Sequence, residues 1–143
     1  MSRKKIQSML LPNVTFYKAL DMRRRGGIER CTLSADTYHL HILSSDRTRE
    51  YVVTVSHGLI SCSCPARGLC PHILATVFYP ALETIAQIRF AQDLQWLELV
   101  VDKYAPAVRE LPEGLRSLVR RELHHRDEQI RRSGGNVYAE KAA

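Results

Sequence analysis

The sequence predicts an α+β fold, in which a small antiparallel β-meander and a short helix are flanked by helices at both ends of the chain. Three observations support this prediction. Polar and apolar residues alternate between residues 28 and 63, which is typical of strands. Apolar residues recur every three or four positions beyond residue 80, which is typical of helices. Cysteine and histidine residues gather between these two regions, at residues 62–72.

The N-terminal segment, residues 1–27, is predicted to hold one basic helix. An amphipathic stretch begins at Asn13, a candidate helix cap, and ends at Arg25, just before two glycines. The apolar run that follows Arg3, Lys4 and Lys5 is too short for the core of a signal peptide. We therefore expect an intracellular protein, either cytoplasmic or associated with the nucleoid, in a compartment that keeps thiols reduced.

Four short strands are predicted in the next segment, residues 28–80. Residues with turn chemistry separate them, so an antiparallel meander is the simplest topology. The predicted strands are Ile28–Leu33, Tyr38–Ile42, Tyr51–Val55 and Leu59–Cys64. Pro71 suits the first position of the helix that follows, and we expect Pro80 to interrupt that helix.

The remaining residues are predicted to form a helical extension, 81–135, and a flexible tail, 136–143. One long apolar stripe runs from Leu82 to Tyr104 and should end near Pro106. A last helix should start near Pro112 and end at Ser133. No stretch approaches the roughly 18 consecutive apolar residues of a membrane-spanning helix. We therefore expect a soluble protein with no membrane partner.

The strongest functional signal is a set of four metal-ligating side chains. In a strand, residues two apart point to the same face, so Cys62 and Cys64 should present both sulfurs together. Cys70 and His72 follow at the start of the predicted helix, whose positive end favours a thiolate. Three sulfurs and one imidazole complete the tetrahedral shell that zinc prefers. We predict one structural Zn²⁺ per chain, because no coordination position remains open for catalysis.

The spacing C-x-C-x5-C-x-H resembles the SWIM zinc finger family, in which these ligands lie on a ββα scaffold. The resemblance covers roughly residues 28–80 and includes Ile73-Leu74-Ala75 after the histidine. One departure is Pro71, where the family often carries a basic residue. The resemblance implies a module that binds DNA or protein without catalysing a reaction, and it does not decide between these two ligands.

Charge favours nucleic acid as the partner. The net charge is +6, and residues 1–30 hold eight Lys and Arg against two acids, whereas residues 81–143 hold ten against ten. A basic segment releases counterions when it meets phosphates. The predicted nucleic-acid contacts, with DNA favoured over RNA, are Arg3, Lys4, Lys5, Arg23, Arg24 and Arg25. A solvated terminus that serves only solubility explains the same charges equally well.

The alternative function is a protein-binding adaptor. The apolar stripe of residues 82–104 exceeds what a small finger covers, so it would dock onto a partner or onto a second copy. No glycine-rich phosphate loop and no recognisable catalytic set are present, so we expect neither an enzyme nor a small-molecule substrate.

The remaining cysteine and histidine residues have simpler explanations. Cys31 is predicted to be a buried free thiol and not a ligand. His39 and His41 share one face of a strand and should form its solvated side. His57 should be a turn residue, and the basic residues around His124 should be paired with acids on an exposed helix.

Overall fold

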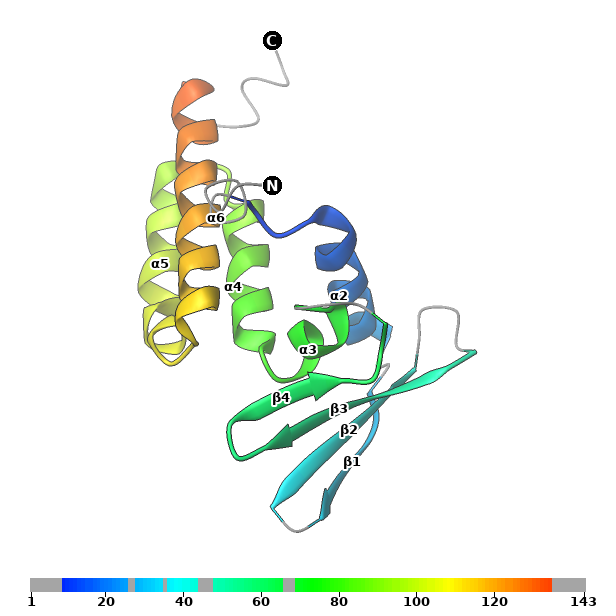
Figure 1. Ribbon diagram of the computed structural model, residues 1–143. Helices are drawn as coiled ribbons and strands as arrows, with labels where there is room; N and C mark the ends of the chain where they lie inside the picture. The colour runs from blue at the N-terminus through cyan, green and yellow to red at the C-terminus, as the bar shows by residue number, and fades with distance from the viewer. Residues whose placement is uncertain (1–8, 26–27, 35, 44–47, 66–68, 135–143) are drawn as a thin grey trace. The chain divides into compact units, whose positions relative to one another are not determined.

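The computed structural model describes residues 9–25, 28–34, 36–43, 48–65 and 69–134. The chain divides into two compact units, which we call the finger unit, Pro12–Leu82, and the helical unit, made of Met1–Leu11 and Glu83–Ala143. Within the described residues there are five helices and one four-stranded sheet (Figure 1). The elements are α2 (Asn13–Arg25), β1 (Ile28–Ser34), β2 (Thr37–Leu43), β3 (Glu50–Ser56), β4 (Leu59–Cys62), α3 (Pro71–Thr76), α4 (Tyr79–Phe90), α5 (Leu94–Arg109) and α6 (Glu113–Arg132).

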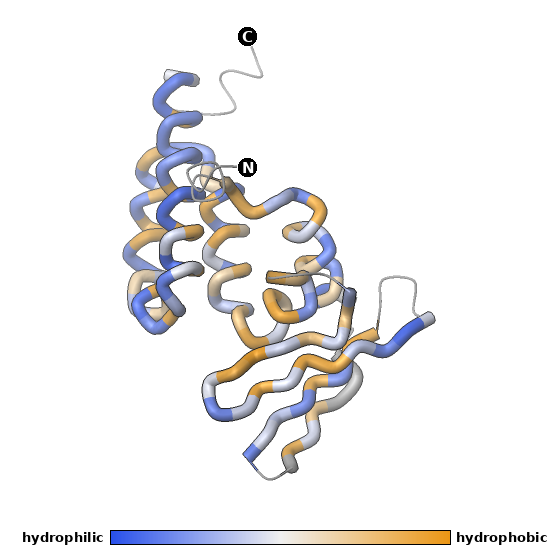
Figure 2. Tube along the Cα trace, viewed as in Figure 1, coloured by the Kyte–Doolittle hydropathy of each residue, from blue (hydrophilic) through white to orange (hydrophobic). Residues whose placement is uncertain are grey.

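The sheet of the finger unit is an antiparallel meander in the order β1-β2-β3-β4, which confirms the predicted topology. Cross-strand partners share a face, so Leu40, Val53 and Cys62 form one row across β2, β3 and β4. His39, Thr54 and Ser61 form the neighbouring row on the opposite, polar face. Apolar and polar residues alternate along these strands in Figure 2, so the sheet has one face suited to a core.

Helices α2 and α3 complete the core of the finger unit. Helix α3 packs against β3 and β4, and α2 packs against α3. Ile42 and Val53 from the sheet, Leu74 from α3 and Phe16 from α2 are all buried. Helix α2, which the sequence analysis set apart within residues 1–27, therefore lies in the same compact unit as the sheet.

The edge strand β1 corrects one prediction. Cys31 is exposed, although it shares a row with Leu40 on the apolar face of the sheet. The contacts of α3 are with β3 and β4, at the other edge of the sheet. The alternation along β1 thus predicts the correct face, but it cannot predict how far the covering helix extends.

The helical region differs from the predicted single stripe because Asp93 starts a new helix. Helix α4 ends at Phe90, and the Asp93 side chain accepts a hydrogen bond of 2.7 Å from the Trp96 amide at the start of α5. Pro80 lies in the first turn of α4, where a missing N–H costs no helical bond. Pro106 lies inside α5, which continues to Arg109.

A buried ion pair ties the helical unit together. Arg89 on α4 donates to both oxygens of Glu122 on α6, at 2.7 and 3.0 Å, and also to the Leu11 carbonyl at 2.7 Å. Glu122 is almost fully buried, so its charge depends on these donors. Most of the predicted stripe is also buried within the chain, including Ile85 and Leu97.

Among the described residues, no helix combines the length and the apolar character needed to cross a membrane. The predicted tail, residues 136–143, lies outside the described residues.

Candidate metal centre

Ser63 fixes the Cys62-Ser63-Cys64 segment just beyond the end of β4. Its amide donates to the Val52 carbonyl at 3.0 Å, and its hydroxyl accepts from the Val52 amide at 2.9 Å. These two bonds extend the β3–β4 pairing past the last ladder residue of β4. The two flanking sulfurs are therefore held by a segment with a defined register.

The turn between β3 and β4 sets this register. His57 and Gly58 have φ of 47° and 79°, the left-handed geometry of a two-residue hairpin turn. Counting outward from this turn places Ser63 opposite Val52, so the role of Ser63 was available from the sequence once the turn was located. The prediction of His57 as a turn residue is confirmed.

Cys70 is both a candidate ligand and the cap of α3. Its sulfur accepts a hydrogen bond of 3.4 Å from the Ile73 amide, and its extended backbone places Pro71 at the first helical position. His72 lies in the first turn of α3, and its side chain is buried. The segment Cys70-Pro71-His72 thus both starts the helix and positions two of the candidate ligands.

The four side chains meet at one point. The candidate ligand atoms of Cys62, Cys64, Cys70 and His72 all lie within 4.8 Å of one another. Zn–S bonds of about 2.3 Å place tetrahedral sulfurs roughly 3.8 Å apart, so a closure of about 1 Å completes the shell. Cys70 and His72 are buried, while Cys62 and Cys64 are half-buried. The structure therefore confirms that these four residues can hold a metal ion.

The sulfurs also influence each other's protonation. The pKa of Cys70 is lowered, chiefly because the Cys62 thiol donates a hydrogen bond to the Cys70 sulfur, and further by the His72 side chain and the Ile73 amide, while burial opposes the shift. The same hydrogen bond, together with burial, raises the pKa of Cys62. A cation bound by both sulfurs would replace this hydrogen bond, because a metal is ligated by thiolates and not by thiols.

His72 provides the most specific sign that the site fits a metal. Its Nδ1 atom is buried and has no hydrogen-bond partner among the described residues, a costly condition for a polar atom. The ring packs against Tyr51 of β3, with the centroids 4.8 Å apart. Tyr51 could not be identified as part of the site from the sequence, because only the paired register of β3 and β4 brings it beside the His72 ring. A metal ion bound at Nδ1 would satisfy the buried nitrogen.

The predicted nucleic-acid contacts are distributed differently. Arg3, Lys4 and Lys5 lie outside the described residues, and Arg25 is the last residue of α2. Arg24 is exposed. Arg23 is also exposed, but it has partners within the finger unit, where its Nη1 donates to the Ala75 carbonyl at 3.4 Å and its guanidinium lies 3.9 Å from the centre of the Tyr79 ring.

Two of the other histidines, His41 and His124, take part in ion pairs, and within the described residues the group of Cys62, Cys64, Cys70 and His72 is the only one that could hold a metal ion. His41 Nδ1 contacts a Glu50 carboxylate oxygen across β2 and β3. His124 pairs with Glu128 at 3.2 Å on α6, and Arg131 pairs with Asp127 at 3.0 Å. These pairs lie on the exposed side of α6, as predicted, but Glu122 is buried against Arg89, and Arg126 donates to the Ala91 carbonyl at 2.9 Å instead of pairing with an acid.

Comparisons with models of protein families, with curated proteins and with solved structures give no match for this chain. The zinc hypothesis therefore depends on the four ligands and their geometry.

Proposed function

We propose that this chain is a small SWIM-type zinc finger protein that binds one structural Zn²⁺ and has no enzymatic activity. Two observations carry this proposal: one ring nitrogen of His72 and three cysteine sulfurs lie within 4.8 Å of one another, and the buried Nδ1 of the same ring has no partner among the described residues. Four protein ligands close the coordination shell, so the metal supplies folding free energy rather than an activated water.

Cobalt substitution tests the proposed ligand set. Co²⁺ bound by three thiolates in a tetrahedral shell gives strong sulfur-to-metal charge-transfer absorption and intense visible bands. We expect both in the wild-type protein and in Cys31→Ser, whose exposed thiol is outside the cluster. His72→Ala and Cys64→Ser should lose or weaken these bands. A spectrum that changes in Cys31→Ser and not in Cys64→Ser would show that the ligand set is wrong.

We propose further that the finger is a nucleic-acid-binding module, with DNA favoured over RNA. The support is the excess of positive charge in residues 1–30 and the exposed Arg24 next to Arg25 at the end of α2. Affinity would come from phosphate contacts and not from base reading. This role places the protein inside the cell, in the cytoplasm or on the nucleoid.

The binding test should separate Arg24 and Arg25 from Arg23, because Arg23 already has partners in the finger unit. The double variant Arg24→Ala/Arg25→Ala should weaken binding to duplex DNA and reduce the slope of log affinity against log salt by up to about 1.8, or about 0.9 per lost contact. The matched control removes the same charge from two exposed residues of α5, with Lys103→Ala/Arg109→Ala. Equal affinities and slopes in the two double variants would eliminate Arg24 and Arg25 as phosphate contacts.

The alternative is a protein-binding adaptor that docks through its C-terminal helices. The observation that favours it is the apolar surface of α5, where Leu99 is 63% exposed and Val101 is 39% exposed. Docking of such a surface depends little on ionic strength, whereas phosphate binding falls steeply with salt. Partner capture measured at low and high salt therefore discriminates between the two functions.

A further inference from the structure

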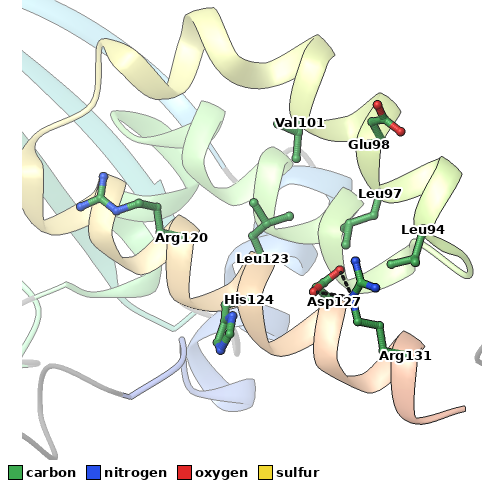
Figure 3. A pocket seen from close by; sticks show the side chains of 9 residues that line it. All are labelled: Leu94, Leu97, Glu98, Val101, Arg120, Leu123, His124, Asp127 and Arg131. Atoms are coloured by element: carbon green, nitrogen blue, oxygen red, sulfur yellow. Dashed lines mark hydrogen bonds and ion pairs between the residues drawn. The ribbon is translucent and has the colours of Figure 1, made fainter. Parts of the chain in front are cut away.

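An open groove lies between α5 and α6 of the helical unit, with a volume of about 630 Å³ (Figure 3). The two helices are consecutive and form a hairpin, since only three residues, 110–112, connect them. Three positions on α5 with helical spacing, Leu94, Leu97 and Val101, supply its apolar side, and Leu123 of α6 faces them. The groove is thus an uncovered apolar seam of the kind that closes a helical bundle.

The two walls of the groove carry different charges. On α5, Glu98 lines the groove and Asp102 follows one turn later, and both are exposed. Neither forms an ion pair within the described part of the chain. On α6, Arg120 and Arg131 line the groove together with His124 and Asp127, so this wall has two arginines against one acid. The α5 wall is therefore acidic, and its two carboxylates have no ion-pair partner within the described residues. The α6 wall presents two arginines.

The arginines of α6 are available for new partners. Arg120 pairs with Glu113 at 2.8 Å and Arg131 pairs with Asp127 at 3.0 Å, and the arginine side chains are 61% and 66% exposed. Exposed pairs of this kind contribute little to stability. An acidic residue of an incoming helix can therefore share or replace either partner at small cost.

We infer that the groove is an interface between two copies of this chain, related by a twofold axis. An isologous interface brings the α5 wall of one copy against the α6 wall of the other, and the same contact occurs twice. Opposite charges on the two walls are complementary under this symmetry. The apolar seams then meet in the centre, so that two α5–α6 hairpins form a four-helix bundle. This inference specifies the occupant of the apolar surface in the adaptor alternative and does not depend on nucleic-acid binding.

Sedimentation equilibrium of the full-length, zinc-loaded protein tests the apolar part of the interface. We expect a monomer–dimer equilibrium and at least a tenfold higher dissociation constant for Val101→Asp. The matched control is Leu59→Asp, which changes a 77% exposed leucine on the finger unit and should leave the dimer intact. Circular dichroism and zinc content check that both variants fold. A wild-type protein that stays monomeric at every concentration overturns the proposal, as does equal weakening by the two variants.

A charge-reversal experiment tests the symmetry. The variant Glu98→Arg/Asp102→Arg makes both walls basic, and Arg120→Glu/Arg131→Glu makes both walls acidic. Each should dimerise at least tenfold more weakly than wild type, while a 1:1 mixture of the two should form a heterodimer. Failure of the mixture to associate overturns the twofold arrangement. Zinc content and DNA binding, measured on the same samples, report separately on the proposed function.

Discussion

The guanidinium of Arg23 lies over the Tyr79 ring and donates to the Ala75 carbonyl in the last turn of α3. It therefore supplies a donor to the end of α3 and connects α2 to the start of α4 within the finger unit. The sequence grouped Arg23 with Arg24 and Arg25 as one basic triplet. The sequence around Arg23 could not show that this arginine lies over an aromatic ring. Tyr79, which supplies the ring, is 56 residues later in the chain.

Arg23→Ala should lower the free energy of unfolding of the finger unit by about 1 kcal/mol, from a partly exposed cation–π contact and one hydrogen bond. Arg24→Ala removes the same charge from an exposed neighbour and should change stability by less than about 0.5 kcal/mol. Urea unfolding followed by circular dichroism measures both values. Equal effects of the two variants would mean that the contacts of Arg23 contribute nothing measurable.

Among the secondary-structure elements, the four strands could be predicted because three features of the sequence indicate the same structure. Polar and apolar residues alternate, turn residues separate the segments, and each segment is short. The ligand set was predictable for a similar reason, since the strand end and the helix start each place two ligands locally. The break between α4 and α5 was not predicted. Apolar spacing continues through residues 91–93, and only the capping geometry of Asp93 shows that the chain leaves one helix and begins another.

Asp93→Ala should destabilise the helical unit by about 1 kcal/mol, because the first-turn amide of Trp96 loses its acceptor. Gln95→Ala, at an exposed position of the same turn, is the control and should be neutral or slightly stabilising. Thermal unfolding of both variants measures the difference. A loss of stability in Gln95→Ala that matches Asp93→Ala would contradict the assignment of Asp93 as the cap.

The β3–β4 turn can be tested with a pair of glycines. Gly58 and Gly114 each have open space where a Cβ would be added, but Gly58 has φ of +79°. Gly58→Ala should therefore cost about 1 to 2 kcal/mol through backbone strain alone. Gly114→Ala, in the first turn of α6, should be neutral or stabilising by up to about 1 kcal/mol. If both substitutions were neutral in chemical unfolding, the left-handed turn at Gly58 would be excluded.

At the scale of the whole molecule, the two units differ in what holds them together. The finger unit has a small sheet and contains all four candidate ligands, whereas the helical unit contains the Arg89–Glu122 pair and has no residue of the metal cluster. The division falls between Leu82 and Glu83, at the start of the apolar stripe and two residues beyond the predicted end of the segment 28–80. The burial of most of that stripe within the chain emerges only from the packed structure.

Removal of zinc with a strong chelator should therefore unfold the finger unit and leave the helical unit folded. Amide hydrogen exchange followed by mass spectrometry should show that protection is lost in β2–β4 and kept in α5 and α6. The helical unit has no residue of the metal cluster, so re-addition of zinc should restore protection in the sheet and leave the protection of α5 and α6 unchanged. Simultaneous loss of protection in both units would show that they fold as one cooperative body.

The central claim is that the four clustered side chains hold a single structural zinc ion. Metal analysis of the purified full-length protein by mass spectrometry is its most direct test. We expect one zinc per chain in wild type and in Cys31→Ser, and a severe loss of zinc together with the folded sheet in Cys64→Ser and His72→Ala. A wild-type protein with a folded sheet and no bound zinc would contradict this claim.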